Sequence, residues 1–377
     1  MREGTVRKLK SYVRTALESC GKLRDANLLN AKALRAIAWV AASAFLMLSS
    51  PARAQSPSPF AVETNIHGIY AYTQPPAGFD PMTASADELK LYGYPPRPAA
   101  TESAEALAQW TMVVNPALKR IVPQLSRRNV YHRPASGLSI QESKKTAASY
   151  NWSGYGLVEK KPTFTSVSGY WIVPTAQAAF GTCSGEPVYA SQWVGIDGFS
   201  NDELFQAGTD TAAECSSGIT DTLYIAWIEW LPNSEIELTA DVAPGDVLNV
   251  IVTATDWSGG ESSNGTLLFT DFTKQWQISE SVTASGLGGT YVVGQSAEWI
   301  VERPEVGGSL ATLANYVANP WYGTTATDLK GKGYTPGSSR SATAYNITMV
   351  DNGGTPISFV QLFGTDTLWF FDENSAY

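Results

Sequence analysis

The sequence predicts an all-β fold, an antiparallel two-sheet β-sandwich, for residues 148–377. Short runs rich in β-branched and aromatic residues recur there and alternate apolar with polar positions, among them SGYGLV, SVSGYWIV, YASQWVGI and DVLNVIVTAT. Gly, Asn, Ser and Pro separate these runs, and no long stretch has the 3.6-residue period of a helix. Many closely spaced strands in a stretch of this length favour one sandwich domain.

Residues 1–54 are predicted to be a secretory signal peptide with an extended basic start. Residues 36–48 (AIAWVAASAFLML) are an uncharged apolar run, and Ala52-Arg53-Ala54 follows as an A-x-A cleavage pattern. The run is too short for a comfortable membrane span. We therefore expect a secreted protein, extracellular or periplasmic, with no membrane partner once the signal is removed.

Residues 55–147 differ from the domain that follows, with Pro-rich patches (QSPSPF, QPPAGFDP, YPPRPAA) and a basic segment from Lys119 to Lys145. Residues 1–150 carry a net charge of +9, and residues 151–377 carry −18. One interpretation is a flexible, less ordered linker. The other is a propeptide, which covers the anionic domain near neutral pH and is released when carboxylates are protonated. We expect cleavage near the end of the basic run, at about Lys145–Tyr150.

The acidic balance of the domain argues against nucleic acid and anionic membranes as partners. Both histidines of the chain, His67 and His132, precede residue 150. A domain without imidazole cannot use Ser-His-Asp or Cys-His nucleophilic catalysis or His-ligated zinc. Any catalysis there must use carboxylates, amides, hydroxyls or tyrosines, and we expect a monomer with no metal and no cofactor.

Cys183 and Cys215 are the two cysteines that follow the predicted signal, and export favours a disulfide between them. The bond would close a loop of about 30 residues, which is worth about 3 kcal/mol on the chain-entropy model.

The stretch SAEWIVERPE, residues 296–305, has the composition of a strand. Successive side chains of a strand point to opposite faces, so Glu298, Ile300 and Glu302 share one face and Trp299 and Val301 the other. The plainest interpretation of two carboxylates on one side is an exposed sheet face.

Three further segments could carry chemistry: NWSGYG (151–156), QWVGIDG (192–198) with FQAGTD (205–210), and YIAWIEW (224–230). Alternation places Trp227 and Glu229 on the same face of their strand. Glycines such as Gly198 and Gly208 permit tight turns or a close approach of backbones. Each segment alone is a weak signal.

Taken in order, these segments resemble the eqolisins, or glutamic peptidases, a family of secreted acid endopeptidases. The resemblance rests on NWSGYGLV, VSGYWIVPT, WVGIDG, FQAGTD, WIEWLP and AEWIVE, and it extends from about residue 149 to the C-terminus. The family's catalytic pair is the glutamine of a Q-x-G-x-D segment and the second glutamate of A-E-W-I-V-E. These positions fall on Gln206 and Glu302.

The resemblance is to a bacterial-type member, and the chain departs from the family's pattern at several positions. Ile225 stands where the family usually has an aspartate, and Arg303-Pro304 follows the catalytic glutamate where fungal members tend to be acidic. These departures leave subsite preferences open. Substrate-binding positions implied by the resemblance and its motifs are Asp197, Gly198, Gly208, Asp210, Trp152, Trp193, Trp227, Glu229 and Glu298, the last as a supporting acid or as part of the substrate rim.

The chemistry implied is hydrolysis of polypeptides without a covalent intermediate. Glu302 as carboxylate takes a proton from a bound water, and the Gln206 amide holds that water and donates to the developing oxyanion. Glu302 then returns the proton to the leaving amine. We expect activity in acid, polypeptide substrates, and the protein's own propeptide as an inhibitor.

Two other functions compete with this one. Sandwiches of the concanavalin or jelly-roll type commonly host glycoside hydrolases, and Glu229 with Glu302 or Glu298 could form an acid and nucleophile pair. A non-catalytic, lectin-like module could use the same aromatic face. Neither alternative explains the glutamine in the Q-x-G-x-D position.

Overall fold

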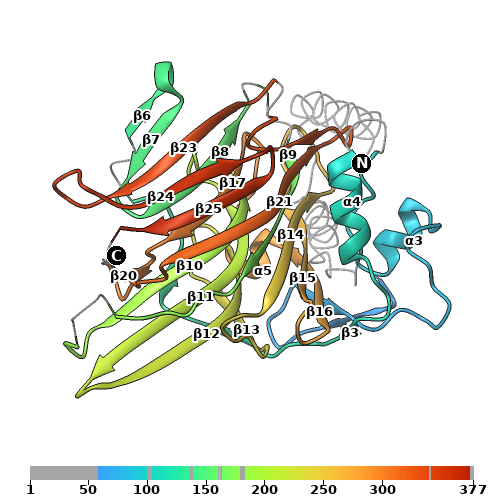
Figure 1. Cartoon of the computed structure of the whole chain (residues 1–377). Coiled ribbons are helices and arrows are strands. Elements are labelled where there is room, and N and C mark those ends of the chain that lie inside the picture. Colours follow the sequence, from blue (N-terminus) through green and yellow to red (C-terminus); the bar gives the residue numbers. More distant parts are fainter. Residues whose placement is uncertain are drawn as a thin grey trace, which may run out of the picture. The chain divides into compact units, whose positions relative to one another are not determined.

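The computed structural model of the protein describes residues 58–99, 104–135, 139–159, 161, 164–178, 183–338 and 341–373. The predicted signal peptide lies outside them. Within the described residues, every helix is too short or too polar to cross a membrane. Strands dominate (Figure 1), and the predicted antiparallel β-sandwich is confirmed.

The first layer is built from long antiparallel strands (Figure 1). In spatial order it comprises β4 (Leu125–Arg127), β13 (Ile236–Leu238), β12 (Ile219–Trp230), β11 (Phe205–Ser216), β10 (Pro187–Ile196), β17 (Ser296–Glu302), β8 (Trp152–Val158) and β23 (Thr343–Val350).

The second layer is antiparallel as well. Its spatial order is β21 (Ala318–Asp328), β9 (Phe164–Ile172), β14 (Val247–Thr255), β15 (Asn264–Asp271), β16 (Trp276–Thr283), β2 (Ile69–Tyr72) and β1 (Ala61–Glu63). Strands β24 (Pro356–Phe363) and β25 (Thr367–Asp372) connect the layers, since β24 pairs with β23 and β25 pairs with β21.

Short elements complete the described fold. Five short strands add to the two layers: β3 (Lys119–Arg120) pairs with β16, β6 (Ser139–Gln141) with β7, β7 (Thr146–Ser149) with β23, β20 (Thr312–Leu313) with β10, and β22 (Gly333–Tyr334) with β21. A separate sheet contains β5 (Val130–Tyr131), β18 (Glu305–Val306) and β19 (Ser309–Leu310). The helices are α3 (Ala86–Leu91), α4 (Ala104–Val113), α5 (Ala284–Leu287) and the 3-10 turn η1 (Glu142–Lys144).

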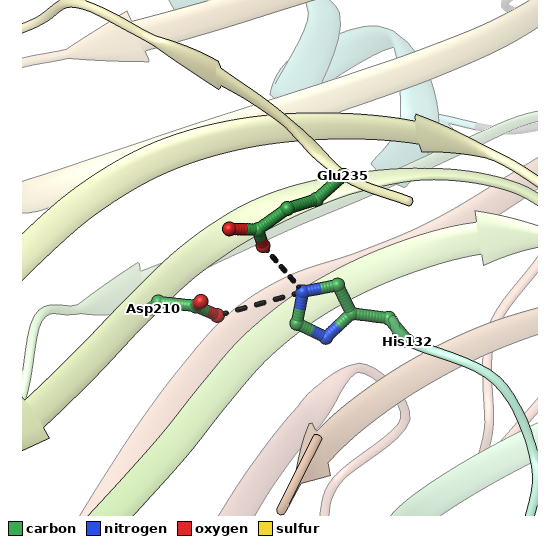
Figure 2. A group of neighbouring side chains, drawn as sticks. All are labelled: His132, Asp210 and Glu235. Atoms are coloured by element: carbon green, nitrogen blue, oxygen red, sulfur yellow. Dashed lines mark hydrogen bonds and ion pairs between the residues drawn. The ribbon is translucent and has the colours of Figure 1, made fainter. Parts of the chain in front are cut away.

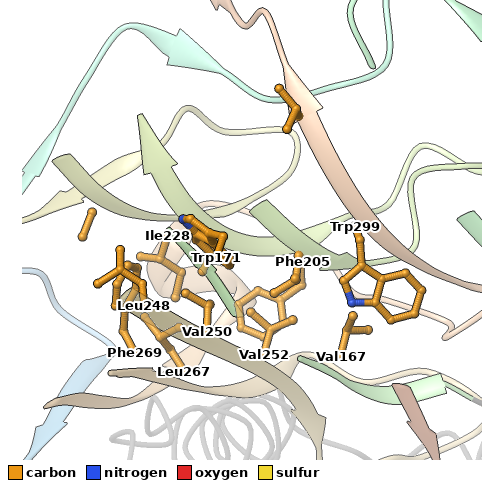
Figure 3. Close-up of a cluster of buried hydrophobic side chains, with 14 of the residues drawn as sticks. Val167, Trp171, Phe205, Ile228, Leu248, Val250, Val252, Leu267, Phe269 and Trp299 are labelled. Atoms are coloured by element: carbon orange, nitrogen blue, oxygen red, sulfur yellow. The ribbon is translucent and has the colours of Figure 1, made fainter. Parts of the chain in front are cut away.

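The main core lies between the layers, where aromatic and β-branched side chains interdigitate (Figure 3). Two tryptophans also join the layers by hydrogen bonds. Trp299 of β17 donates from Nε1 to the carbonyl oxygen of Ser168 over 2.8 Å, and Trp171 of β9 donates to Oγ1 of Thr209 over 3.1 Å. Burial of one Leu or Phe stabilises a fold by about 1.5–3 kcal/mol, so these apolar faces hold the sandwich together.

The predicted alternation along β17 is confirmed. Trp299 and Val301 belong to the core between the layers, whereas Ile300 packs in a second cluster with Trp152 and Trp193. Glu298 and Glu302 therefore emerge on the outer face of the first layer. That face is covered, because both glutamates are fully buried.

The region before residue 148 supplies part of this cover. Its described residues form strands β1 to β7 and helices α3 and α4, and several of these strands add to the edges of the two layers. The expected cleavage region, about Lys145–Tyr150, includes β7, which pairs in parallel with β23.

Candidate active site

The two predicted catalytic residues lie on the outer face of the first layer, on the two strands that flank β10. Gln206 of β11 lies opposite Gly195 of β10, and Glu302 of β17 lies opposite Ser191 of β10. Directly opposed residues in a sheet project from the same face. Glu229 of β12 is the direct neighbour of Gln206, on that same face.

Two tryptophans flank a glycine on this face. Gly208 of β11 lies opposite Trp193 on one side and Trp227 on the other. A Cβ at Gly208 would lie 2.0 Å from the carbonyl oxygen of Gln192 and 2.6 Å from Cβ of Trp193. Because the backbones of β10 and β11 approach closely there, only glycine fits at position 208. The missing side chain leaves room between the two indole rings.

His132, from the region before the sandwich, fills that part of the site (Figure 2). Its ring stacks on Trp227 with 3.8 Å between centroids and 3° between planes. Its Nε2 lies 2.8 Å from Oε2 of Glu235 and 3.6 Å from Oδ1 of Asp210. Its Nδ1 lies 3.5 Å from Oε2 of Glu302. The side chain is fully buried and stands among three carboxylates.

The backbone of His132 contacts the other half of the predicted pair. Its carbonyl oxygen accepts a hydrogen bond from Nε2 of Gln206. Its N–H donates to Oε2 of Glu229 over 3.1 Å, and that oxygen also accepts from Gln206 Nε2 over 2.5 Å. One residue thus touches both Gln206 and Glu302, which brings the two predicted catalytic side chains to a common occupant.

Glu302 is held by a donor on each oxygen. Asn151 donates from Nδ2 to Oε1 over 2.8 Å, and Trp193 donates from Nε1 to Oε2 over 2.7 Å. Asn151 also donates to the carbonyl oxygen of Arg133 over 2.8 Å and accepts from the N–H of Ala135 over 2.9 Å. Asn151 therefore connects the carboxylate to a polypeptide backbone that lies next to it.

Residues 128–135, hereafter the strap, cross this face from β13 to the segment that follows β17. At the β13 edge, Arg128 donates its N–H to the carbonyl of Glu235 over 3.2 Å, and its Nε lies 2.8 Å from Oε1 of the same residue. Beyond the end of β17, β5 pairs with β18, and Arg133 lies 2.8 Å from the Glu305 carboxylate. The strap is thus anchored by backbone pairing and ion pairs on both sides of His132.

Burial and charge set the electrostatics of the site. Desolvation raises the pKa of Glu302, raises the pKa of Glu229 to about 8 and, together with the charge of Glu235, raises the pKa of Asp210 to about 7. Burial opposes a charged imidazole, but the nearby carboxylates outweigh it and raise the pKa of His132 well above its usual value. His132 is therefore an imidazolium at neutral pH, and its charge lowers the pKa of each of these three carboxyl groups relative to the same buried group without it.

His132, Asp210 and Glu235 also have the composition of a metal-ligand set, since their donor atoms lie within 4.8 Å of one another. Arg128 pairs with one Glu235 oxygen, and the imidazole occupies the other. The set is thus satisfied as a network of ion pairs within the protein.

Two further predicted site residues, Trp152 and Glu298, lie on this face. Trp152 lies opposite Glu302 and meets the Trp193 ring edge-on at 4.9 Å between centroids, so it borders the site. Glu298 lies on the same face and is fully buried, but its carboxylate makes none of the contacts among described residues that join His132, Gln206 and Glu302. Its role as a supporting acid or as part of the substrate rim stays a prediction.

Asp197, a predicted substrate-binding residue, is fully buried. Its carboxylate accepts hydrogen bonds from the N–H groups of Val293, Gly294 and Gln295 and from the side chain of Asn201. It therefore anchors the segment that leads into β17. Its neighbour Gly198 belongs to the same loop, with φ of 103°, a backbone conformation that favours glycine.

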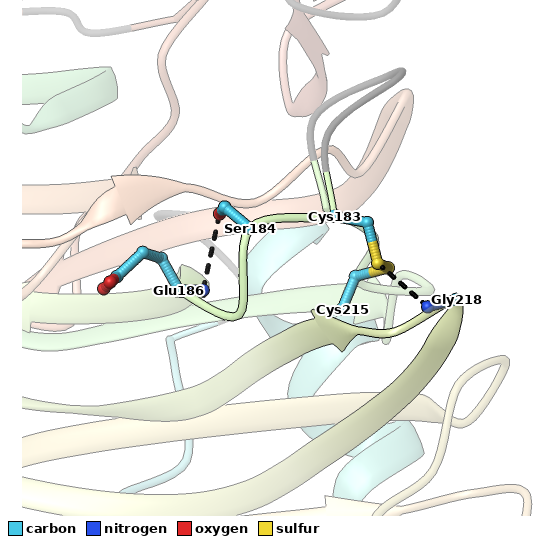
Figure 4. Close-up of a disulfide and its surroundings, with 5 residues drawn as sticks. All are labelled: Cys183, Ser184, Glu186, Cys215 and Gly218. Atoms are coloured by element: carbon cyan, nitrogen blue, oxygen red, sulfur yellow. Dashed lines mark hydrogen bonds between the residues drawn. A yellow bond between two sulfur atoms is a disulfide. The ribbon is translucent and has the colours of Figure 1, made fainter.

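The predicted disulfide between Cys183 and Cys215 is present, with Cα atoms 4.7 Å apart (Figure 4). It joins the start of the β10 segment to the end of β11, and the N–H of Gly218 in the β11–β12 turn donates to Sγ of Cys183. It therefore stabilises the far end of the hairpin that carries Gln206 and Glu229.

Sequence reasoning missed three residues of the site. His132 was assigned to a region outside the domain, Glu235 lies in a connection without a motif, and Asn151 was noted only as the first letter of NWSGYG. The one signal for Asn151 was its place in that motif. Nothing in the sequence indicated that β4 and β5 would bring His132 onto this face, because strand pairing between distant segments leaves no local pattern.

Comparisons with known proteins match the part of the chain that contains Gln206 and Glu302. The model of the peptidase A4 family matches residues 150–367. Aspergillopepsin-2 of Aspergillus niger is 30% identical over 197 residues, which are 48% of this chain and 64% of that protein. The chain thus spans less than two thirds of the length of this relative.

Similar solved structures include aspergilloglutamic peptidase from Aspergillus niger, 24% identical with a TM-score of 0.41, covering 49% of this chain and 99% of that chain. Tailspike protein 2 of an Escherichia coli O157:H7 bacteriophage is 11% identical with a TM-score of 0.22, covering 52% of this chain and 26% of that chain. At these TM-scores, neither likeness carries an argument. The assignment to a bacterial-type member stays a prediction.

Proposed function

Because the chain belongs to the peptidase A4 family, we propose that it is an acid endopeptidase in which Glu302 and Gln206 activate a water molecule against the peptide bond. The observation that carries this proposal is the position of His132. Its carbonyl oxygen accepts from Gln206 while its ring lies beside Glu302. A peptide group therefore fits between these two side chains.

The reaction needs a base and an oxyanion donor. Glu302 as carboxylate takes the proton from water, and the hydroxide attacks the carbonyl carbon of the substrate. Gln206 donates from Nε2 to the carbonyl oxygen, as it does to that of His132, and stabilises the negative charge that develops there. Protonated Glu302 then passes the proton to the leaving nitrogen.

Asn151 and Trp193 are positioning residues for this chemistry. They donate to the two oxygens of Glu302 and fix the orientation of the carboxylate. These bonds also favour its ionised form, which offsets part of the desolvation that raises its pKa.

The experiment is hydrolysis of a denatured protein by the acid-treated full chain, with Glu302→Gln and Gln206→Ala beside the wild type. We expect Glu302→Gln to be inactive, and Gln206→Ala to lose about 10²–10³ in rate, the usual cost of one lost oxyanion donor. Full activity of Glu302→Gln, or an optimum at pH 7–8, would contradict the mechanism. The family match favours this function over a glycoside hydrolase or a lectin.

We propose further that residues 55–147 act as an inhibitory propeptide, with the strap as the inhibiting part. The imidazolium of His132 lies where a water would have to stand to be activated by Glu302. Protonation of the surrounding carboxylates removes its counter-charges and leaves a buried cation, which is costly. Acid should therefore release the strap.

Export of the protein by residues 1–54 remains a prediction.

The inhibition is tested by comparing intact precursor at pH 7 and pH 4. We expect no hydrolysis at pH 7 and activity at pH 4, with N-terminal sequencing of the products to locate the cut. An intact precursor that is fully active at pH 7 would rule out inhibition by the strap.

A further inference from the structure

The pocket that holds the His132 ring has a chemistry of its own. Trp227 forms one wall, and Asp210 and Glu235 carry carboxylates against Nε2 on the ring edge. All three residues are at most 2% exposed. Asp210 comes from β11, Trp227 from β12 and Glu235 from the connection to β13, so the sandwich itself builds the pocket.

The register of the strap relates this pocket to the proposed reaction. The carbonyl that Gln206 contacts and the ring in the pocket belong to the same residue, His132. In a substrate, the carbonyl that accepts from Gln206 is that of the scissile bond. The residue whose side chain enters the pocket is therefore the one that contributes the scissile carbonyl.

Release of the strap changes the charge balance of the pocket. Two cations leave together, His132 and Arg128, both of which contact the Glu235 carboxylate. Asp210 keeps a hydrogen bond from Oγ of Ser191, at 2.6 Å. Glu229 and Glu302 lie at the inner side of the same space and are acidic as well. The open pocket is thus lined by carboxyl groups. Among the described residues of the sandwich, no lysine or arginine contacts these carboxyl groups.

We propose that this pocket is the specificity subsite of the enzyme, and that it selects substrates with a flat cationic side chain, imidazolium or guanidinium, on the carbonyl side of the scissile bond. The inference rests on the proposed peptidase function. A flat cation stacks on Trp227, donates to Glu235 and lies within ion-pair distance of Asp210, as His132 does. An aliphatic side chain there would leave Asp210 with the Ser191 hydroxyl as its donor and would give Glu235 no donor in place of the cation.

The test uses acid-treated full-chain protein and peptides that are identical except for His, Arg or Leu before the scissile bond. We expect kcat/KM for His and for Arg to exceed that for Leu at least tenfold at pH 5. Glu235→Gln and Asp210→Asn should each reduce the His-to-Leu ratio about tenfold. The matched control is Glu280→Gln, a fully buried glutamate on β16 of the second layer, which should leave the ratio unchanged.

The outcomes separate the two proposals. Cleavage without preference, or preference for Leu, would overturn the subsite and leave the peptidase function standing. If the enzyme cleaved none of the peptides and did not hydrolyse denatured protein, both the peptidase function and the subsite would be overturned.

A second measurement does not depend on catalysis or on the pocket variants folding. In the intact precursor at pH 6, hydrogen exchange of the strap should stay slow in His132→Arg and accelerate at least tenfold in His132→Leu. Equal exchange in the two variants would overturn the proposal, since the pocket would then not distinguish a flat cation from an aliphatic group.

Discussion

The region before the sandwich is attached to the two layers in different ways. On the second layer, α3 and α4 pack apolar side chains such as Trp110 and Val113 against Tyr170, Ile251 and Leu268. On the first layer, the strap contributes a buried imidazolium that is surrounded by carboxylates. Apolar contacts do not change with protonation, but ion pairs between buried groups do. The comparison indicates that acid can open one attachment and leave the other closed.

The sign of the pH effect follows from the pKa shifts. Docking raises the pKa of His132, so its contribution is present below its usual pKa near 6.5 and is lost as pH rises through the raised value. Desolvation raises the pKa of Glu302, Asp210 and Glu229 overall, and the imidazolium offsets part of this rise, so its attraction to these carboxylates is lost as pH falls through their raised pKa values. The ion pairs of the strap therefore require a protonated His132 together with ionised carboxylates, and they are lost in acid once the carboxyl groups are protonated.

The largest effect should come from the apolar attachment. Trp110→Ala removes a ring that is 3% exposed and should lower the free energy of unfolding of the precursor by about 3–5 kcal/mol. Denaturant unfolding at pH 7 and pH 5 measures it. A loss that differs strongly between the two pH values would contradict the distinction between the attachments.

A change at His132 should be smaller and should depend on pH. His132→Asn removes the cation and the stacking on Trp227, and should weaken strap docking by about 1–3 kcal/mol at pH 7. Hydrogen exchange of the strap at pH 7 should rise by the corresponding factor, about 5–150. The same measurement on α4 serves as the internal control and should not change.

Asn151 should connect inhibition and catalysis. Asn151→Ala removes a donor to Glu302 and the two contacts to the strap backbone, so it should lower kcat about tenfold and shift the acid limb of the pH profile upward. Asn151→Asp, which keeps the shape, tests whether the amide donor matters. An unchanged pH profile in Asn151→Ala would mean that Asn151 supports the fold and does not influence the ionisation of Glu302.

The smallest effect is expected from Glu229. Its pKa of about 8, raised by desolvation, means that its ionisation adds a negative charge beside Gln206 as pH rises. Glu229→Gln should therefore retain activity a few tenths to one pH unit further on the alkaline side. A pH–rate profile of kcat/KM shows this, and a steeper alkaline loss in the variant would contradict it.

Local patterns predicted much of the framework. Alternation along β17 and β12 put Glu302 and Glu229 on the outer face, and the ordered motifs identified Gln206 and Glu302 as a pair that the structure brings to one occupant. The family resemblance predicts Asp197 as a substrate-binding residue. Its hydrogen bonds with the backbone of Val293–Gln295 were not predicted, because this contact depends on long-range folding.

The strap was beyond such reasoning for a physical reason. Its position depends on the pairing of β4 with β13 and of β5 with β18, strands of two or three residues that have no periodicity of their own. A single histidine in a basic, Pro-rich region carries no sign that it will be buried. The absence of imidazole from residues 148–377 was a correct count, but the site of the precursor contains one from outside that range.

These two short pairings have a consequence for maturation. Breaking the chain between the strap and the sandwich cuts no hydrogen bond of β4 or β5, and it leaves the packing of α4 in place. The severed fragment should stay bound as a separate polypeptide, so a denaturing gel would show the mature mass while the enzyme is still silent. Loss of the fragment, and not scission itself, would then be the event that sets the onset of proteolysis.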